Sequence, residues 1–286
     1  MRKLLAILSI VMMAMMIVSC SGEEKEGNAA APAEEGQRDD LVIAISTEPT
    51  TLRPASTALV YDEVVINQLY GRLLYHDMDM KVHPYLAESW EKIDDTHYKF
   101  ILKDGLKFSD GSDVKSEDVA ASLQAVHDNP ASQSYADWYD STEIIDDRTF
   151  IINLSAPSAT FFDNLAIKCH IAPKALLEGD HDFNSAPVGS GPYKLVSWEQ
   201  GESITLTENE YFNVEGFEAH IPDITIRIIP EGVTRTIALE RGEVDYIWDV
   251  QASDLPELEQ EEGVTIYTSP SCTPVFLCLN YDRIPD

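Results

Sequence analysis

Residues 224–248 read ITIRIIPEGVTRTIALERGEVDYIW, and this stretch decides the fold class. Apolar and polar residues alternate over residues 224–228, which is typical of a β-strand with one buried face. Residues 234–240 then predict a short helix ended by Gly242, and residues 244–248 predict a further strand. A strand, a helix and a strand in this order predict parallel pairing through a right-handed crossover. The stretch therefore indicates an α/β protein.

Another strand of the same sheet is predicted near the start of the folded body. Residues 41–45 read LVIAI, a continuous apolar run that is typical of a strand buried on both faces of a parallel sheet. A proline-rich loop, Thr47–Pro54, follows it. Open α/β sheets bind ligands outside the carboxyl ends of their strands. We therefore expect this loop to lie at a ligand site.

The stretch between these strands has a mixed α+β pattern. Residues 62–75 predict a helix with apolar residues four apart, and residues 98–102 alternate as a strand. Ser116 is expected to be the N-cap of a second helix that continues through Val126. The sequence thus predicts one sheet domain that is interrupted by a subdomain at about 61–186.

The amino-terminal residues resemble an export signal. A short basic segment precedes an apolar run at residues 4–18, which is short for a membrane span of roughly 20 residues but typical of a signal peptide. The run ends near Cys20, and the Ile-Val-Ser-Cys sequence there is similar to a bacterial lipobox, whose cysteine carries lipid. We expect a signal peptide at 1–19, a disordered lipoprotein tether at 20–40 and an extracytoplasmic protein anchored to the cell membrane. The alternative is an ordinary signal peptide with an incidental cysteine.

Composition argues against several classes of function. The formal net charge of −30 disfavours nucleic acid and anionic membrane surfaces as partners, because both require a basic patch. The seven histidines are scattered and form no HxH or HExxH motif, so we expect no bound metal. Gly189 and Gly191 flank a serine without the GxGxxG spacing, which indicates a tight turn and not a phosphate cradle. We expect a binding protein without a cofactor, and not an enzyme.

Six blocks of sequence, in order along the chain, resemble those of one protein family. They are Gln68–Leu73 (QLYGRL), His83–Trp90 (HPYLAESW), Phe100–Gly111 (FILKDGLKFSDG), Ser116–Val119 (SEDV), Pro187–Trp198 (PVGSGPYKLVSW) and Gly242–Asp245 (GEVD). On these residues the chain is identified as a member of the family 5 bacterial extracellular solute-binding proteins. These are the peptide- and nickel-binding proteins of ABC importers.

The resemblance implies a class II periplasmic-binding-protein fold with two lobes. The first lobe would span 41–270 and carry the inserted α+β subdomain, and 271–286 would start the crossing to the second lobe. By the same resemblance the chain is C-terminally truncated, with the second lobe largely missing. The implied function is capture of a small solute, above all a peptide, by hinge closure of a monomeric protein. The closed form would deliver the solute to a permease in the membrane.

The resemblance also implies ligand contacts. Ser56, Thr57 and Ala58 align with the family's contact loop in the first lobe, and Asn280 lies in the crossing segment. Tyr135 and Trp138 align loosely with an aromatic wall. From the residues alone, these two aromatic side chains in a polar loop have two interpretations, a lid packed on the subdomain or a stacking surface for a ligand.

Two alternatives to a transport function stay open at this point. One is a non-functional fragment that lacks the second lobe. The other is a secreted hydrolase, which would require a pair of a nucleophile and a base that the sequence does not reveal.

Overall fold

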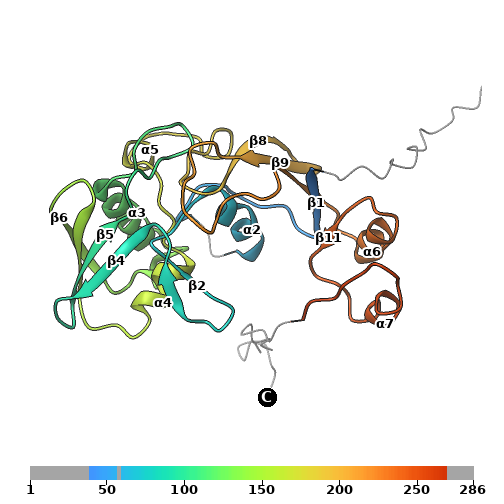
Figure 1. The fold of residues 1–286 in the computed structure, drawn as a ribbon, viewed down its shortest axis with the longest axis horizontal. Helices are drawn as coiled ribbons and strands as arrows, with labels where there is room; N and C mark the ends of the chain where they lie inside the picture. Colours follow the sequence, from blue (N-terminus) through green and yellow to red (C-terminus); the bar gives the residue numbers. More distant parts are fainter. Residues whose placement is uncertain (1–38, 57–58, 269–286) are drawn as a thin grey trace, which may run out of the picture. The chain divides into compact units, whose positions relative to one another are not determined.

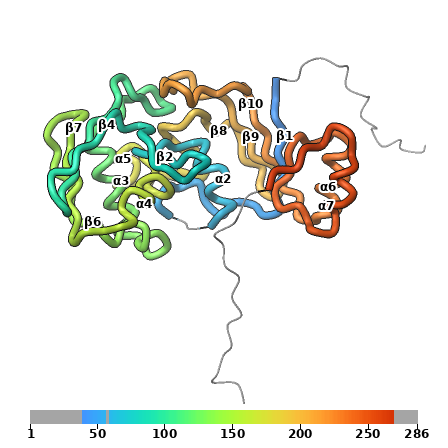
Figure 2. The backbone as a smooth tube through the Cα atoms, turned by 60° about the horizontal axis from the view of Figure 1, so that its bottom comes forward, coloured from blue at the N-terminus to red at the C-terminus, as the bar shows by residue number. Residues whose placement is uncertain are grey.

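The computed structural model describes residues 39–56 and 59–268. The chain forms one large sheet, one smaller antiparallel sheet and a two-stranded ribbon, with helices packed around them (Figures 1 and 2). Within these residues, no helix combines the length and apolar character that crossing a bilayer requires.

The large sheet has five strands in the order β11-β1-β10-β9-β8. Its strands are β1 (Asp40–Ile45), β8 (Tyr193–Glu199), β9 (Ser203–Glu208), β10 (Asp223–Ile228) and β11 (Tyr246–Ile247). Strand β1 pairs in parallel with both β10 and β11, whereas β8, β9 and β10 pair in antiparallel fashion. The predicted strand–helix–strand unit is confirmed as β10, α6 (Gly232–Glu240) and β11. Its two strands flank β1 and do not pair with each other, and a four-residue helix, α7 (Leu255–Leu258), follows.

The smaller sheet has the order β4-β5-β7-β6, with every pair antiparallel. Its strands are β4 (Ala87–Lys92), β5 (His97–Leu102), β6 (Tyr139–Ile144) and β7 (Thr149–Leu154). The ribbon consists of β2 (Leu74–His76) and β3 (Val82–Pro84). The helices of this part are α2 (Val60–Leu69), α3 (Ser116–Asp128), η1 (Gln133–Tyr135), α4 (Phe161–Ile167) and α5 (Lys174–Leu177). This whole α+β part lies between β1 and β8 in the sequence, so an insertion interrupts the large sheet.

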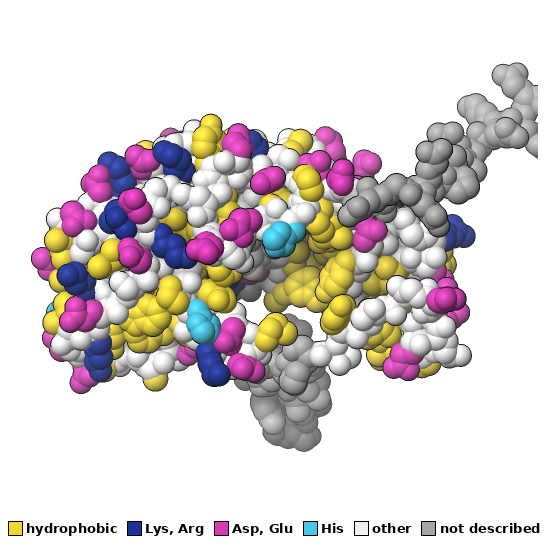
Figure 3. Space-filling view, viewed as in Figure 1, with side chains coloured by type: hydrophobic (Ala, Val, Ile, Leu, Met, Phe, Trp, Pro, Cys, Tyr) yellow, Lys and Arg dark blue, Asp and Glu magenta, His cyan; other side chains and the backbone are white. Residues whose placement is uncertain are grey.

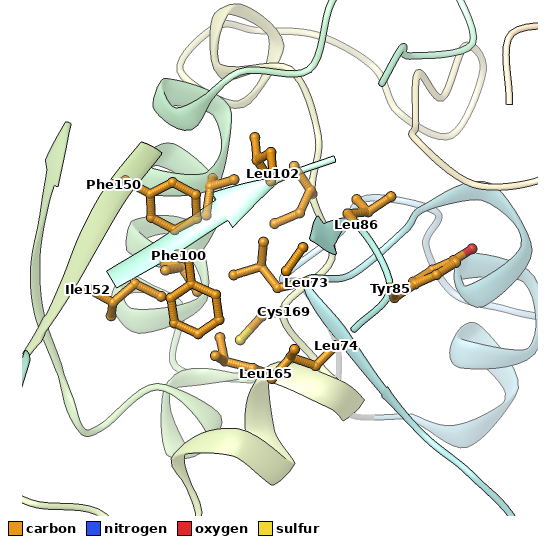
Figure 4. Packing of buried hydrophobic residues seen from close by; sticks show 14 of the residues in the cluster. Leu73, Leu74, Tyr85, Leu86, Phe100, Leu102, Phe150, Ile152, Leu165 and Cys169 are labelled. Carbon is orange, nitrogen blue, oxygen red and sulfur yellow. The ribbon is translucent and has the colours of Figure 1, made fainter. Parts of the chain in front are cut away.

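The core of the inserted part explains why it is a separate packing unit. Phe100 and Phe150 are fully buried and stack on neighbouring strands with ring centroids 5.8 Å apart. Leu73, Leu165 and Cys169 converge on the same interior, as Figure 4 shows. A second cluster, which includes Ile204, Ile226 and Val65, fills the space between α2 and the large sheet. Burial of these two apolar sets is the main stabilising contribution in each part.

Two local predictions are wrong, and tertiary contacts explain both. The helix predicted over 62–75 ends at Leu69, because the chain turns extended at Tyr70 so that Leu74 can pair with Pro84 in the ribbon. Ser116 is the first residue inside α3 and not its N-cap, and its hydroxyl is buried without a partner. The Asp118 carboxylate instead accepts a hydrogen bond from the backbone N–H of Lys115 at 2.8 Å, which satisfies this helix start.

Candidate functional site

The carboxyl ends of three parallel strands meet at one edge of the large sheet. Strands β10, β1 and β11 end at Ile228, Ile45 and Ile247, and the loops that follow them lie next to one another. Backbone hydrogen bonds tie the loops after β10 and β11 to the end of β1, from Ile229 N to Ile45 O at 2.9 Å and from Trp248 N to Ala44 O at 3.2 Å. This edge is where an open α/β sheet binds its ligand.

A carboxylate and two hydroxyl groups meet at this edge. The Asp249 carboxylate accepts hydrogen bonds through Oδ2 from the hydroxyls of Ser46, at 3.2 Å, and Tyr61. Asp249 is exposed and has a φ of +61°, in the left-handed region that non-glycine residues rarely occupy. Such strain persists only where the surroundings impose it, and it clusters at functional sites.

Aromatic rings border the same carboxylate. The ring of Tyr61, near the start of α2, lies 6.0 Å from the indole of Trp248 at an angle of 55°. Both side chains are half-buried, so each presents part of its ring to solvent. In the space-filling view, hydrophobic side chains gather around the hollow near the middle of the molecule, and acidic side chains are spread over the surrounding face (Figure 3).

Arg235 of α6 holds two of the edge loops in place. Its guanidinium donates to the carbonyl oxygens of Ile229, at 2.7 Å, and Pro230, at 2.8 Å, and to the carbonyl of Asp249 at 3.1 Å. The side chain is buried, and the residue is only 4% exposed. Arg235 is therefore a positioning residue that ties the loop after β10 to the loop after β11.

The loop after β1 is fixed by side chains from distant elements. The fully buried Asp62 accepts hydrogen bonds from the backbone N–H of Thr50 at 2.6 Å and from its hydroxyl at 2.9 Å. The indole N–H of Trp198 donates to Glu48 at 2.8 Å, and Asn184 accepts from the N–H of Leu52 at 2.8 Å. A loop held by such contacts presents its neighbours in one conformation, which favours binding.

The structure separates the predicted contact residues. Ser56 is half-buried and follows Ala55, which has a φ of +63° and whose carbonyl accepts a 2.7 Å hydrogen bond from Ser132. Ser132 lies three residues before the half-buried Tyr135, so this bond links the two segments. Trp138 is 3% exposed, and its ring packs edge-on against the ring of Phe161 with centroids 4.7 Å apart. For Trp138 this agrees with the first of the two interpretations, a side chain packed on the subdomain. Thr57, Ala58, Asn280 and Cys20 lie outside the described residues.

Sequence reasoning missed a buried charged cluster beside α2. Glu63 and Lys168 form a 2.6 Å ion pair with side-chain exposures of 15% and 7%. The N–H of His170 Nε2 donates to Asn67 Oδ1, which accepts it at 2.9 Å. Burial raises the pKa of Glu63, an effect that Lys168 opposes, and burial lowers the pKa of His170 well below its ordinary value. No periodicity reveals this cluster, because its members lie about a hundred residues apart.

The described residues also limit the chemistry of the site. Within residues 39–56 and 59–268, no group of three or more His, Cys, Asp or Glu side chains is placed to hold a metal ion. The edge of the sheet therefore offers hydroxyls, a carboxylate and aromatic faces. Such groups recognise polar solutes by hydrogen bonding and stacking.

The parallel strands end at an edge that offers hydroxyls, a carboxylate and aromatic rings, and an inserted subdomain interrupts their sheet. These two features together are typical of one lobe of a solute-binding protein. The family model for "Bacterial extracellular solute-binding proteins, family 5 Middle" matches residues 81–285. The chain belongs to this family, whose members are transport binding proteins and not enzymes.

Curated relatives agree with this assignment. The glutathione-binding protein GsiB of Escherichia coli K12 is 29% identical over 252 residues, which is 86% of this chain and 49% of that protein. The probable D,D-dipeptide-binding periplasmic protein DdpA of the same organism is 31% identical over 268 residues, covering 87% of this chain and 50% of that protein. The chain thus spans about half the length of the curated relatives it matches.

Solved structures confirm the fold class. The binding protein AgaA of A. tumefaciens R10, in complex with agropinic acid, has a TM-score of 0.73 and 31% identity, covering 78% of this chain and 46% of that one. The oligopeptide-binding protein AppA of Bacillus subtilis, in complex with a nonapeptide, has a TM-score of 0.70 and 26% identity with the same coverage. The expected periplasmic-binding-protein fold, α/β with an inserted α+β part, is therefore confirmed.

Proposed function

We propose that this chain belongs to the extracytoplasmic substrate-binding component of an ABC importer. It captures peptides or solutes of similar size by closure of two lobes and delivers them to a membrane permease. The observation that carries this function is the family match over residues 81–285, on a lobe whose parallel strands end in a polar and aromatic edge. In this proposal the first lobe spans 41–270, with its inserted subdomain at about 61–186, and 271–286 begins the crossing to the second lobe.

Peptides are the solute class that the relatives favour. GsiB is described as glutathione-binding, DdpA as a probable D,D-dipeptide-binding protein, and AppA holds a nonapeptide. NikZ of Campylobacter jejuni, 29% identical, holds Ni(L-His), so nickel chelates are the second class to test. All these ligands carry amide or amino nitrogens that can donate to a carboxylate.

In this proposal the Asp249 carboxylate accepts a hydrogen bond from such a nitrogen of the solute. Both hydrogen bonds from Ser46 and Tyr61 reach its Oδ2 atom, and no described residue donates to Oδ1. The side chain forms no ion pair with a described lysine or arginine. The second oxygen of this carboxylate is therefore available to an N–H or ammonium group of the solute. Ser56, Thr57, Ala58, Tyr135 and Asn280 remain the further proposed contacts, whereas Trp138, which is 3% exposed, is assigned to packing within the subdomain.

Hinge closure is part of this proposal and is supported by the family to which the chain belongs. A solute bound at this edge leaves its far side free to contact the second lobe, and it stabilises the closed form by the difference in its affinity for the two forms. A permease that recognises only the closed form then receives loaded protein. In this proposal the protein acts as a monomer.

The test is a thermal-shift screen with di-, tri- and oligopeptides, nickel–histidine and sugars, followed by titration calorimetry of each hit. A solute that binds only the native form stabilises it by about 2.7 kcal/mol at a hundred times its Kd. Asp249→Asn is expected to weaken peptide binding about tenfold. Asp79→Asn removes the same charge from a hairpin tip whose side chain is 78% exposed, and it should leave binding unchanged. The proposal fails if no compound of the screen binds.

The lipid anchor at Cys20 is a separate part of the proposal. Expression of the chain in bacteria fed an alkyne-tagged fatty acid should label the protein and place it in the membrane fraction. Cys20→Ser should abolish the label while the apolar run at residues 4–18 still directs export. Labelling that survives this substitution would refute lipidation at Cys20.

A further inference from the structure

A pocket of about 360 Å³ lies beside the buried charged cluster, away from the strand ends of the candidate site. It is bounded by α2, by the segment that leads into the β2–β3 ribbon, by the end of α4 and by Phe217. Arg72, Lys168, Glu63 and Asn67 supply its charged and amide groups, and the remainder of the lining is Tyr75, His76, Ala166, Ile167 and Phe217. Its volume is at the lower end of the range of small-molecule sites.

Arg72 is the unusual member of this lining. Among the described residues, its side chain makes one hydrogen bond, a 3.2 Å donation from Nη1 to the carbonyl of Ile167. Its Nε–H is buried and has no acceptor, and among the described residues no carboxylate forms an ion pair with the guanidinium. Arg72 is half-buried, and removing part of an arginine's charge from water is costly when no carboxylate compensates it.

The backbone around Arg72 holds the guanidinium in position. Arg72 forms an isolated antiparallel bridge with His170, and its carbonyl accepts from the N–H of Leu86 at 3.0 Å. The preceding residue, Gly71, donates its N–H to the hydroxyl of Ser190 at 3.1 Å. The backbone of Arg72 is therefore fixed on both sides, and the hydrogen bond from Nη1 to the carbonyl of Ile167 orients the guanidinium.

The charges that line the pocket do not cancel. Lys168 and Glu63 neutralise each other in their 2.6 Å pair, and Glu63 has no second carboxylate beside it in the lining. His170, which contacts this pair, is neutral because burial lowers its pKa well below 6.5. The ring of His76, also in the lining, lies 2.9 Å from the carboxylate of Asp163, which is not part of the lining. The pocket thus keeps the positive charge of Arg72, although the whole chain has a net charge of −30.

We infer that this pocket binds an anionic group, a carboxylate or a phosphate, of a small solute through Arg72. The planar fork of a guanidinium donates two parallel hydrogen bonds to such groups, here through its terminal Nη1 and Nη2 atoms, since the Nε atom is buried. Tyr75 and Phe217, with ring centroids 4.8 Å apart, supply an apolar wall for the body of the solute. This site does not depend on the proposed transport function, since it uses neither Asp249 nor the sheet edge.

The experiment uses the full chain labelled with ¹⁵N-arginine and follows the Nε–H signals by NMR. The Arg72 signal is the one that is absent from the spectrum of Arg72→Lys. N-acetylglycine and inorganic phosphate are the two anionic probes, and N-acetylglycinamide is the neutral control of matched shape. We expect at least one anion to shift the Arg72 signal in a saturable way, and the neutral amide to leave it unchanged.

Two substitutions separate this site from general charge effects. Arg72→Gln should weaken binding of the active probe about tenfold or more, and Arg72→Lys, which keeps the charge without the fork, should weaken it less. Arg241→Gln removes the same charge from an arginine whose side chain is 69% exposed, and it should leave binding unchanged. If only phosphate binds, the solute is a phosphate compound, and if only N-acetylglycine binds, it is a carboxylate.

The inference is overturned if neither anion shifts the Arg72 signal in the wild-type chain. It is also overturned if Arg72→Gln binds as tightly as the wild type. The affinity is measured on the wild-type chain, and Arg72→Lys is needed only to assign the signal, so a loss of stability in Arg72→Gln does not affect the titration. A failure here leaves the proposed function standing, because the peptide screen and the Asp249→Asn variant test that function without using Arg72.

Discussion

The turn at Val188–Tyr193 runs so close to the end of α2 that Gly189 has no room for a side chain. A Cβ atom at Gly189 would lie 2.0 Å from the carbonyl oxygen of Leu69 and 2.7 Å from the ring of Tyr70. The same holds at Gly191, where a Cβ atom would lie 2.4 Å from the carbonyl oxygen of Gln68. Both glycines are required by close approach of two backbones, which connects the family's glycine-rich block to the helix that carries Tyr61.

The magnitude of the Gly189→Ala effect follows from these distances. Cβ atoms essentially never approach other atoms closer than 3.0 Å, so the two backbones must separate by about 1 Å. Overpacking of this kind typically costs about 1–3 kcal/mol. The separation also strains the 2.9 Å hydrogen bond from Gly191 N to Leu69 O, which contributes about 1 kcal/mol. We expect the free energy of unfolding to fall by about 3 kcal/mol.

Urea denaturation at 25 °C, followed by tryptophan fluorescence, measures this change. The control is Gly201→Ala, where φ is +75° and no atom lies within 4 Å of the added Cβ, so only the left-handed backbone is penalised, by about 1–2 kcal/mol. Gly189→Ala should therefore lose more stability than Gly201→Ala. Equal losses for the two variants would refute the role of backbone contact.

Three further predictions concern buried side chains, and urea unfolding measures each of them. Burial keeps His170 neutral in the folded state, whereas in the unfolded chain this histidine takes up a proton below its ordinary pKa of 6.5. The free energy of unfolding should therefore fall as the pH drops below 6.5, by about 1.4 kcal/mol per pH unit. His170→Gln should flatten this slope, and an unchanged slope would contradict the assignment. Lys168→Met leaves Glu63 buried without its lysine partner and should lower the free energy of unfolding by about 3–5 kcal/mol. Adding Glu63→Gln to Lys168→Met should restore most of this loss. A double variant as unstable as Lys168→Met would rule out the unpaired charge as the cause. Trp138→Ala should cost about 3–5 kcal/mol because its ring is buried in the core, and a loss below 1 kcal/mol would show that the ring does not pack as described.

Local sequence patterns determined the elements of the fold and its class. Strands β1, β5 and β10 follow from apolar runs or alternation, because a strand's side chains alternate between two faces. The end of α6 was predictable in the same way, because Gly242 adopts a φ of +67° that glycine tolerates best. The six sequence blocks also identified the family before any coordinates, and the family match confirmed them.

Tertiary structure alone decided the constellations that matter for binding. Tyr61 and Asp249 are 188 positions apart and meet only because β11 lies beside β1. Arg72 and Lys168 likewise line one pocket only because the chain bridges residue 72 to residue 170. Periodicity describes which face of an element is apolar, but it carries no information about which distant segment will cover that face. Sheet order and packing supply that information, and with it the positions of the carboxylate and the guanidinium.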